Sequence, residues 1–309
     1  MIERIYIGCC ATDVWLARIS VASIRYWHPE IPICLLRDHG RGRFETSEIE
    51  KCWSVEAIDS EPRYSGWGYT KLELLFRPLR ERFLFVDADT AFVGPLLEVL
   101  DARPEQFIVS PDVIDDPRTH HVMGVYLNCE NVQAWDPDYE FPGYVFNAGQ
   151  FVATSGIIEP EDFAEVVEWS VPPALLRRDL FFSADQGFMN YLLVSLARKG
   201  RLTLGTATLY YDGQSDEAAQ LSFHPPARQH PFLLHWPGEK PPLVSGFARG
   251  DILAFFEDFY YSRVPGGTVR RAARAARRLA KAWPREFAVK LYQALPQGVR
   301  QMVKKFAGR

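Results

Sequence analysis

Two aspartates that follow an apolar run are the first residues whose types and spacing suggest chemistry. Asp87 and Asp89 come directly after Phe-Leu-Phe-Val at 83–86. Side chains alternate along an extended segment, so the pair shares one side of the chain. Carboxylates at this spacing suit Mg²⁺ or Mn²⁺, and a nucleotide diphosphate can supply the remaining oxygen ligands. Solvated carboxylates at a strand end have the same pattern, so the pair alone leaves both interpretations open.

The elements that must position this pair follow from the hydrophobic pattern. Apolar or β-branched runs predict strands at 4–9, 32–36, 56–58, 82–86, 145–153, 202–204 and 232–235. Amphipathic stretches predict helices at 13–26, 70–79, 161–169 and 184–199. The alternation predicts an α/β fold with a mostly parallel central sheet flanked by helices. In such sheets ligands bind beyond the carboxyl ends of the strands, which is where Asp87 and Asp89 fall.

Four further segments accompany the aspartate pair in a fixed order. They are Lys71, Phe146-Asn147-Ala148-Gly149, Ala184-Asp185-Gln186 and His235-Trp236-Pro237-Gly238-Glu239-Lys240-Pro241. Together they resemble the motifs of the GT-A glycosyltransferases, most closely glycosyltransferase family eight, which includes glycogenin and bacterial lipopolysaccharide galactosyltransferases. The resemblance covers about 71–241 and implies the GT-A nucleotide-diphospho-sugar transferase fold.

The resemblance implies a role for each matching residue. Mn²⁺ or Mg²⁺ would be held by Asp87, Asp89 and His235. The donor diphosphate would contact Lys71, Asp87, Gly238 and Lys240. The donor sugar would contact Asn147 and the catalytic residues Asp185 and Gln186, with Gln186 stabilising the oxocarbenium-like centre. The implied donor is a nucleotide sugar, most simply UDP-hexose, and the implied reaction is retaining. The implied acceptor is a glycan or lipid-linked sugar, as in lipopolysaccharide or capsule assembly.

Elementary chemistry agrees with these roles, and each residue also has a plainer interpretation. A neutral imidazole such as His235 is a good Mn²⁺ ligand, and Gly238 lets the backbone approach a phosphate. However, a strand-end histidine, a helix N-terminal carboxylate at Asp185, a solvated Lys71 and a turn residue at Asn147 are the ordinary alternatives.

The first predicted strand and its loop depart from the family pattern. The family places an aspartate there, followed shortly by a tyrosine that grips uracil, whereas this chain has Cys-Cys-Ala-Thr-Asp-Val-Trp at 9–15. Asp13 is displaced, and the tyrosine is missing. The closing motif is also one residue short between Gly238 and Lys240. The sequence is therefore identified as a divergent member.

Charge is distributed unevenly along the chain. Residues 268–309 carry about 12 Lys or Arg and one acid, against a net charge of −4 for the whole chain. We therefore predict a GT-A domain at 1–262, with an acidic surface, and a basic amphipathic helical tail at 263–309. A nucleic-acid partner is disfavoured because no basic surface is evident outside the tail.

The sequence of the tail predicts a helix with one basic and one apolar face, and Pro284 is expected to interrupt this helix. Seven basic residues share one arc: Arg270, Arg271, Arg274, Arg277, Arg278, Lys281 and Arg285. Apolar residues, including Val269, Leu279 and Trp283, lie opposite them. This pattern is typical of a helix lying on an anionic membrane surface, and a solvated helix packed on the acidic domain is the alternative.

Composition bounds the remaining choices. No run of 18 apolar residues predicts a membrane-spanning helix, and the N-terminus has no signal-peptide pattern. The five cysteines lack the spacing of a zinc site, which favours free thiols and a cytoplasmic location, with peripheral binding to the inner face of the membrane. The segment 110–144 is long, polar and aromatic, and we predict that it is the acceptor loop.

Three other functions are compatible with an Asp-x-Asp pair after a strand. A haloacid-dehalogenase-like phosphatase would use Asp87 as its nucleophile, but its signature wants Thr or Val where this chain has Ala91. A nucleotidyltransferase would also use a metal ion and a nucleoside phosphate. A non-catalytic sugar- or nucleotide-binding protein on a decayed transferase fold would bind UDP poorly and without regard to Mn²⁺.

Overall fold

The computed structural model describes residues 1–294, apart from 67, 183, 226–229 and 239, and gives only the backbone of 184 and 283–294. Two compact units divide the chain, one spanning Met1–Pro237 and the other beginning at Gly238. The five cysteines are free thiols, as predicted.

A seven-stranded sheet forms the centre of the first unit, in the order β10-β6-β7-β4-β1-β2-β3. Its strands are β1 (Arg4–Cys10), β2 (Ile33–Asp38), β3 (Glu56–Asp59), β4 (Arg82–Asp87), β6 (Phe107–Val113), β7 (Tyr144–Thr154) and β10 (Leu204–Thr206). Only β7 runs antiparallel to its neighbours in this sheet, β4 and β6. The predicted α/β fold with a mostly parallel central sheet is confirmed.

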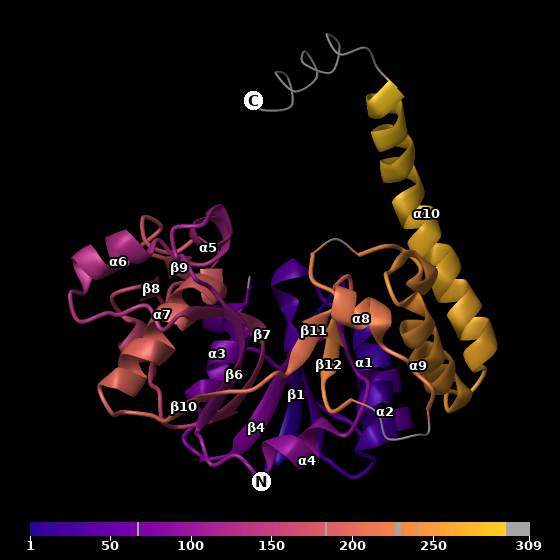
Figure 1. The fold of residues 1–309 in the computed structure, drawn as a ribbon. Coiled ribbons are helices and arrows are strands. Elements are labelled where there is room, and N and C mark those ends of the chain that lie inside the picture. The colour runs from indigo at the N-terminus through magenta and orange to yellow at the C-terminus, as the bar shows by residue number, and fades with distance from the viewer. Residues whose placement is uncertain (67, 183, 226–229, 239, 295–309) are drawn as a thin grey trace. The chain divides into compact units, whose positions relative to one another are not determined.

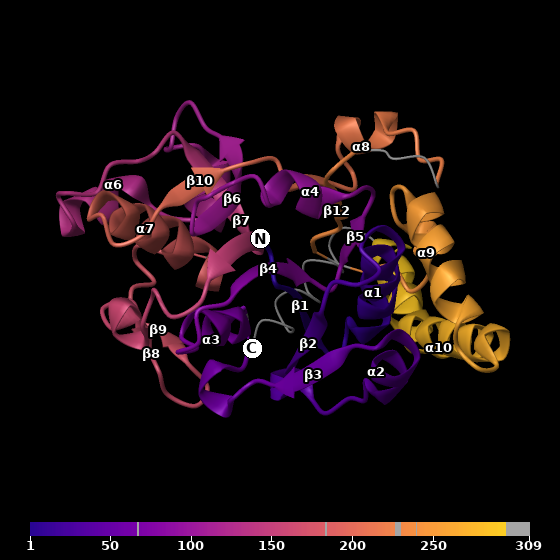
Figure 2. The ribbon, with the colours of Figure 1, turned by 90° about the horizontal axis from the view of Figure 1, so that it is seen from below.

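Helices cover both faces of this sheet. Figure 2 shows α3 (Leu72–Leu75) and α7 (Ala184–Arg198) on one side, and α1 (Val14–Trp27) and α2 (Ser47–Trp53) on the other. Helix α7 packs on β7, and α1 packs on β1. Fully buried phenylalanines, such as Phe85, Phe151 and Phe188, belong to the core on the α7 side. Burial of these rings is the main favourable term that fixes the helices on the sheet.

A second, three-stranded sheet brings the C-terminal part of the first unit next to the aspartate pair. Its order is β11-β12-β5, with β5 (Thr90–Phe92), β11 (Tyr210–Asp212) and β12 (Leu233–His235). Strand β12 pairs antiparallel with β5, so that His235 lies opposite Thr90. Neither β5 nor β11 was predicted, whereas β12, which also has three residues, lies within the strand predicted at 232–235.

Two of the predicted segments are wrong in detail. The segment predicted as a loop at 110–144 contains the end of β6, then α5 (His120–Val125) and α6 (Cys129–Trp135). Side chains of Thr119 and Asn128 cap these two short helices. The helix predicted at 161–169 is a single 3₁₀ turn at Pro160–Phe163, followed by β8 (Val167–Glu168), which pairs with β9 (Ala174–Leu175). The remaining helices of this unit are α4 (Leu96–Leu100) and α8 (Asp216–Gln220).

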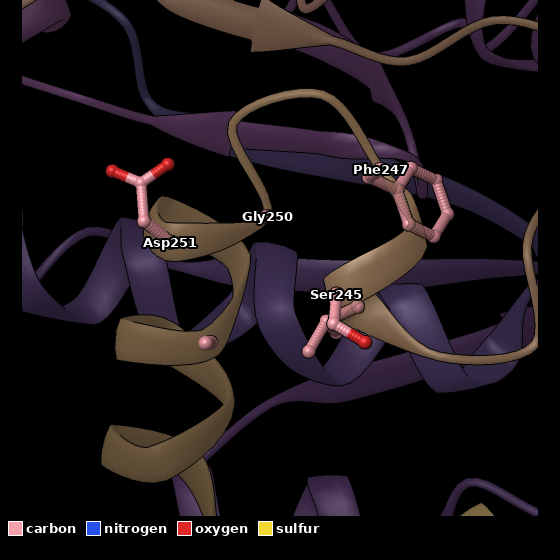
Figure 3. A pocket seen from close by; sticks show the side chains of 6 residues that line it. Ser245, Phe247, Gly250 and Asp251 are labelled. Carbon is pink, nitrogen blue, oxygen red and sulfur yellow. The ribbon is translucent and has the colours of Figure 1, made fainter.

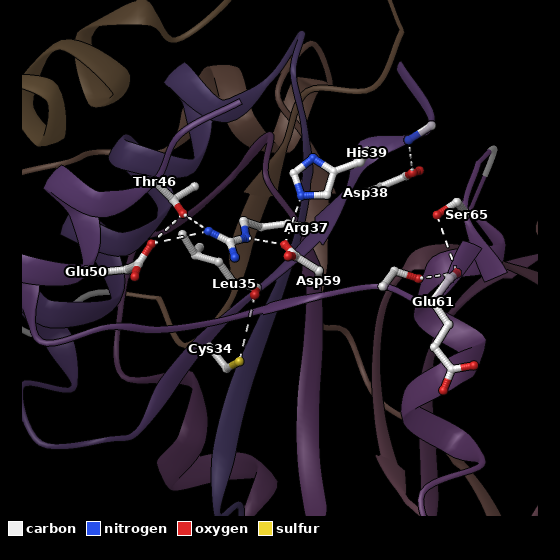
Figure 4. A network of polar contacts seen from close by, with 12 residues as sticks. Cys34, Leu35, Arg37, Asp38, His39, Thr46, Glu50, Asp59, Glu61 and Ser65 are labelled. Atoms are coloured by element: carbon white, nitrogen blue, oxygen red, sulfur yellow. Dashed lines mark hydrogen bonds and ion pairs between the residues drawn. The ribbon is translucent and has the colours of Figure 1, made fainter. Parts of the chain in front are cut away.

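Polar contacts fix the loops at the carboxyl ends of β2 and β3 (Figure 4). Arg37 donates to Asp59 at 2.7 Å and to Thr46 at 3.0 Å, so its guanidinium lies between two loops. A hydrogen bond from His39, together with Arg37, lowers the pKa of Asp59. Asp38 accepts backbone hydrogen bonds from Gly40 and Gly66, which ties the turn after β2 to the loop that leads to α3.

The second unit consists mainly of two helices, α9 (Gly250–Ser262) and α10 (Gly267–Ala294), which Figure 1 shows side by side. Glu257 on α9 is 5% exposed, and it accepts hydrogen bonds from Arg271 at 2.9 Å and Arg278 at 3.4 Å. The basic side of α10 therefore contacts α9, whereas Val269 and Leu279 are 74% and 43% exposed.

The backbone of α10 continues through Pro284, which was predicted to interrupt it. A proline removes one backbone hydrogen bond but fits the helical φ angle, so a helix can pass through it at a cost. Within the described part of the chain, no helix is long and apolar enough to cross a membrane.

Candidate functional site

The aspartate pair and His235 meet where the two sheets of the first unit join. Asp87 ends β4, and the Ala88 backbone N–H donates to the Gly8 carbonyl at 3.0 Å. The Trp236 backbone N–H donates to the Asp89 carbonyl at 3.0 Å, which extends the β5–β12 pairing. One ligand atom from each of Asp87, Asp89 and His235 lies within 4.8 Å of the other two. His235 Nε2 is 3.4 Å from Asp89 Oδ1.

This donor set fits a hard divalent cation. Two carboxylates and one imidazole suit Mn²⁺ or Mg²⁺ and leave positions for phosphate oxygens. His235 is only 2% exposed, and its Nδ1 has no hydrogen-bond partner among the described residues. The Gly149 backbone also lies so close to the site that no side chain fits there: a Cβ atom at Gly149 would lie 2.4 Å from Asp87 Oδ2. The three side chains are therefore held by β-sheet pairing and by a close backbone approach.

Lys71 lies inside the protein between two carboxylates. It is 5% exposed, and its Nζ is 2.7 Å from Asp185 Oδ2 and 4.0 Å from Asp87 Oδ1. It also donates to the Ala148 carbonyl at 2.7 Å. These contacts exclude the alternative of a solvated helix lysine.

Burial and charge act in opposite directions in this cluster. Burial favours the neutral amine, but the carboxylates of Asp185 and Asp87 outweigh it and raise the pKa of Lys71. Burial raises the pKa of Asp87 to about 6, and Lys71 opposes that rise. The site therefore holds an ammonium in its interior and a carboxyl group that titrates close to neutral pH.

Asp185 and Gln186 begin α7 and face the strand β7. Gln186 Oε1 accepts from the Ala148 backbone N–H at 3.4 Å. Gly68 has a φ of 84°, and a Cβ atom there would lie 2.2 Å from Asp185 Oδ1. Glycine therefore meets two needs at position 68, a left-handed backbone and room for the carboxylate.

The predicted sugar-contacting residue Asn147 is oriented by its own strand. Its Oδ1 accepts from the Gly149 backbone N–H at 2.7 Å. The buried Asn190 on α7 hydrogen-bonds both the N–H and the carbonyl of Phe146, each at 2.8 Å. Sequence reasoning did not identify Asn190, because an asparagine in a helix carries no signal of a cross-sheet partner.

Two predicted residues belong to the second unit. Gly238 has a φ of 83°, a conformation that glycine adopts without strain, and Lys240 is half-buried. The cluster around Asp87 is complete without them.

The displaced Asp13 has a structural role in the loop after β1. Its Oδ1 accepts from the Cys10 backbone N–H at 2.6 Å, and the Cys10 thiol donates to Oδ2 at 3.3 Å. The carboxylate therefore closes the turn between β1 and α1.

A cavity of about 370 Å³ lies in the second unit (Figure 3). Its lining residues are Val244, Ser245, Phe247, Gly250, Asp251 and Ala254. Asp251 is held by Arg249 at 2.9 Å, and none of the predicted site residues lines the cavity.

Comparison with known proteins identifies the fold. No protein-family model and no curated protein matches the chain. The solved structure of the galactosyltransferase LgtC with donor and acceptor sugar analogs aligns over 84% of this chain and 95% of LgtC, at 16% identity and a TM-score of 0.55. The bifunctional glycosyltransferase WbbM aligns over 86% of this chain, at 16% identity and a TM-score of 0.54. This chain spans 50% of the WbbM chain. The likeness confirms the predicted GT-A fold.

Proposed function

We propose that this protein is a metal-dependent glycosyltransferase that moves a hexose from a nucleotide sugar, most simply a UDP-sugar, to a glycan or lipid-linked acceptor. The single observation that carries the proposal is the convergence of Asp87, Asp89 and His235 at the carboxyl end of β4. A GT-A fold around this donor set supports the same reaction.

Each residue of the cluster has a part in the proposal. Asp87, Asp89 and His235 hold Mn²⁺ or Mg²⁺, which when bound neutralises negative charge on the departing diphosphate. Asp185 and Gln186 address the donor sugar from the start of α7, together with Asn147. Gln186 stabilises positive charge at the reacting carbon, and the configuration there is retained. Gly238 and Lys240 contact the diphosphate.

Lys71 is a positioning residue in this proposal rather than a direct ligand of the diphosphate. Its ammonium contacts Asp185 and Asp87 at once, so it sets the distance between the sugar-binding and metal-binding carboxylates. It also opposes the rise in the pKa of Asp87 that burial causes, because an adjacent positive charge favours the charged carboxylate.

Titration calorimetry of UDP tests the proposal, with Mn²⁺ and with EDTA. We expect UDP to bind the wild-type protein with Mn²⁺ and to lose most of its affinity in EDTA or in Asp89→Asn. The matched control is Asp138→Asn, an exposed aspartate outside the cluster. UDP binding that ignores both EDTA and Asp89→Asn would contradict the metal-dependent reaction. Preference for another nucleotide would keep the metal site and change the donor.

The tail suggests how the protein reaches a lipid-linked acceptor. We propose that α10 lies on an anionic membrane surface with its exposed apolar side, which includes Val269 and Leu279, against the lipid. Arg277 and Lys281 are exposed on the same helix and suit anionic headgroups.

Vesicle flotation tests this orientation of α10. The double substitution of Val269 and Leu279 by Glu should abolish binding to vesicles that contain phosphatidylglycerol. The control Leu79→Glu changes a residue that is 77% exposed in the first unit and should bind normally. Equal binding of both variants would refute the membrane role of this face.

A further inference from the structure

Four side chains, one of which packs against His235, have no part in the donor chemistry proposed above. They are Asp112 at the end of β6, His121 and Tyr126 at the start and end of α5, and Tyr210 at the start of β11. They come from segments far apart in the sequence, and their chemistry is that of a saccharide-binding surface.

Backbone and side-chain contacts hold the ends of β6 and the approach to β11 together. The Ala207 backbone N–H donates to the Val109 carbonyl at 3.0 Å, and the Leu209 N–H donates to Ser110 Oγ at 3.2 Å. Asp112 and Tyr210 follow directly after these contacts. Burial raises the pKa of Tyr210, and the nearby Tyr126 and Asp112 add to the rise.

The side chains form a connected series beside His235. The Tyr210 ring packs edge-on against the His235 imidazole, with centroids 5.5 Å apart and planes at 78°. His121 Nε2 is 3.5 Å from Asp112 Oδ2, and both side chains are 55% exposed. The His121 ring packs edge-on against Tyr126 at 5.6 Å. Tyr210, at one end of the series, therefore touches a proposed metal ligand, and the Asp112 and His121 side chains remain open to solvent.

The other end of the series rests against the helix that carries the catalytic residues. The Tyr126 carbonyl accepts from the Phe182 backbone N–H at 3.2 Å. A Cβ atom at Gly187 would lie 2.3 Å from the same carbonyl, so α7 and Tyr126 are in close contact. Gly187 directly follows Asp185 and Gln186. The series thus runs from the metal ligand His235 to the start of α7.

We infer that Asp112, His121 and Tyr210 form the acceptor subsite, with the buried Tyr126 packed against His121, and that the subsite takes a neutral sugar unit; this inference rests on the proposed transferase function. Sugars present apolar C–H faces, which pack on aromatic rings, and hydroxyl pairs, which bind carboxylates and imidazoles through charge-assisted hydrogen bonds. The exposed Asp112 carboxylate repels phosphate and carboxylate groups, so anionic acceptor units are disfavoured.

Sequence reasoning placed the acceptor somewhere in 110–144, and the structure narrows that choice. Asp115, Asp116 and His120 were equally plausible from the sequence, yet Asp116 pairs with the exposed Arg118 at 2.9 Å. Tyr210 lies outside the predicted segment altogether.

Saturation-transfer-difference NMR on the UDP·Mn²⁺-loaded protein tests the inference, with lactose, maltose and cellobiose as probes. We expect at least one of these neutral disaccharides to bind the wild-type protein. Asp112→Asn and His121→Gln should each weaken that binding about tenfold, the effect of losing one charge-assisted hydrogen bond. Both positions are exposed, so the variants should fold. Asp138→Asn, in the same segment, should bind like wild type.

UDP binding in the same samples distinguishes a failure of the acceptor subsite from a failure of the proposed transferase function. Variants that retain Mn²⁺-dependent UDP binding but lose the disaccharide support the subsite. Equal disaccharide binding by wild type, Asp112→Asn and His121→Gln overturns it, as does the absence of binding by all three probes when UDP is bound. Failure of the wild-type protein to bind UDP overturns the proposed function itself, and the subsite with it.

Discussion

Replacing Lys71 by methionine tests the charge arrangement of the site most directly. Methionine fills the space of the lysine stem but removes the ammonium that lies 2.7 Å from Asp185 and 4.0 Å from Asp87. The lysine side chain is 6% exposed, and those of Asp185 and Asp87 are 15% and 37% exposed. The variant therefore leaves carboxylates in the interior without their counter-charge.

The contacts set the expected magnitude. Removing one partner of a buried ion pair costs about 3–5 kcal/mol of folding free energy. Because water reaches part of Asp87, we expect the lower end, about 3 kcal/mol. For a folding unit of this size the unfolding temperature should fall by roughly 6–12 °C. A lysine on the surface has no such effect, so Lys51→Met is the matched control.

Urea unfolding followed by tryptophan fluorescence measures the difference near neutral pH and again on acidification. Lys71 holds the pKa of Asp87 down, so its loss should raise that pKa above about 6. Acidification then protonates the Asp87 carboxylate, which has lost its counter-charge in the variant, and so removes the uncompensated negative charge. The stability difference between wild type and Lys71→Met should therefore narrow as the pH falls through the variant's raised pKa toward about 6, and level off below about 6, where Asp87 is protonated in both proteins. A variant as stable as wild type, or a gap that acid leaves unchanged, would refute this reasoning.

Two further outcomes are expected at the same cluster. The raised pKa of Asp87 means that its folding contribution in the ion-free protein is present at low pH and lost as pH rises through about 6. Mn²⁺ competes with that proton, so calorimetry should show Mn²⁺ affinity falling toward tenfold per pH unit below about pH 6, and a flat profile would contradict it. Gly149→Ala should weaken Mn²⁺ binding by about tenfold to a hundredfold, because its Cβ would lie 2.4 Å from Asp87 Oδ2. The control Gly124→Ala has only ordinary contacts, and unchanged Mn²⁺ binding by Gly149→Ala would argue against the crowding.

Strong local patterns predicted much of the fold. The run that became β4 and the amphipathic stretch that became α1 are long enough to carry a clear period, and the structure confirms both. Segments with weaker patterns were misassigned. The helices α5 and α6 lie in a stretch predicted as a loop, because each is short and begins at a single capping side chain.

Motif order identified the candidate site residues but not their contacts. Lys71 was expected to face the diphosphate, whereas its ammonium is buried against Asp185 and the Ala148 carbonyl. Asn190 and Gly68 had no local signal, since their importance comes from partners on other elements. A sequence motif gives residue types in order. It does not show which polar atoms already have hydrogen-bond partners in the folded protein and which remain available to a ligand.

The sequence by itself determined the strand that delivers Asp87 and Asp89 and the basic composition of the tail. Local backbone preference and side-chain alternation are sufficient for these features. Only the tertiary structure decided that β12 pairs with β5 and brings His235 to Asp89, across nearly half of the chain. It also decided that Asp112, His121, Tyr126 and Tyr210 adjoin one another. Such long-range contacts depend on formation of the whole core. A local segment alone buries too little apolar surface to offset the conformational entropy that these contacts cost.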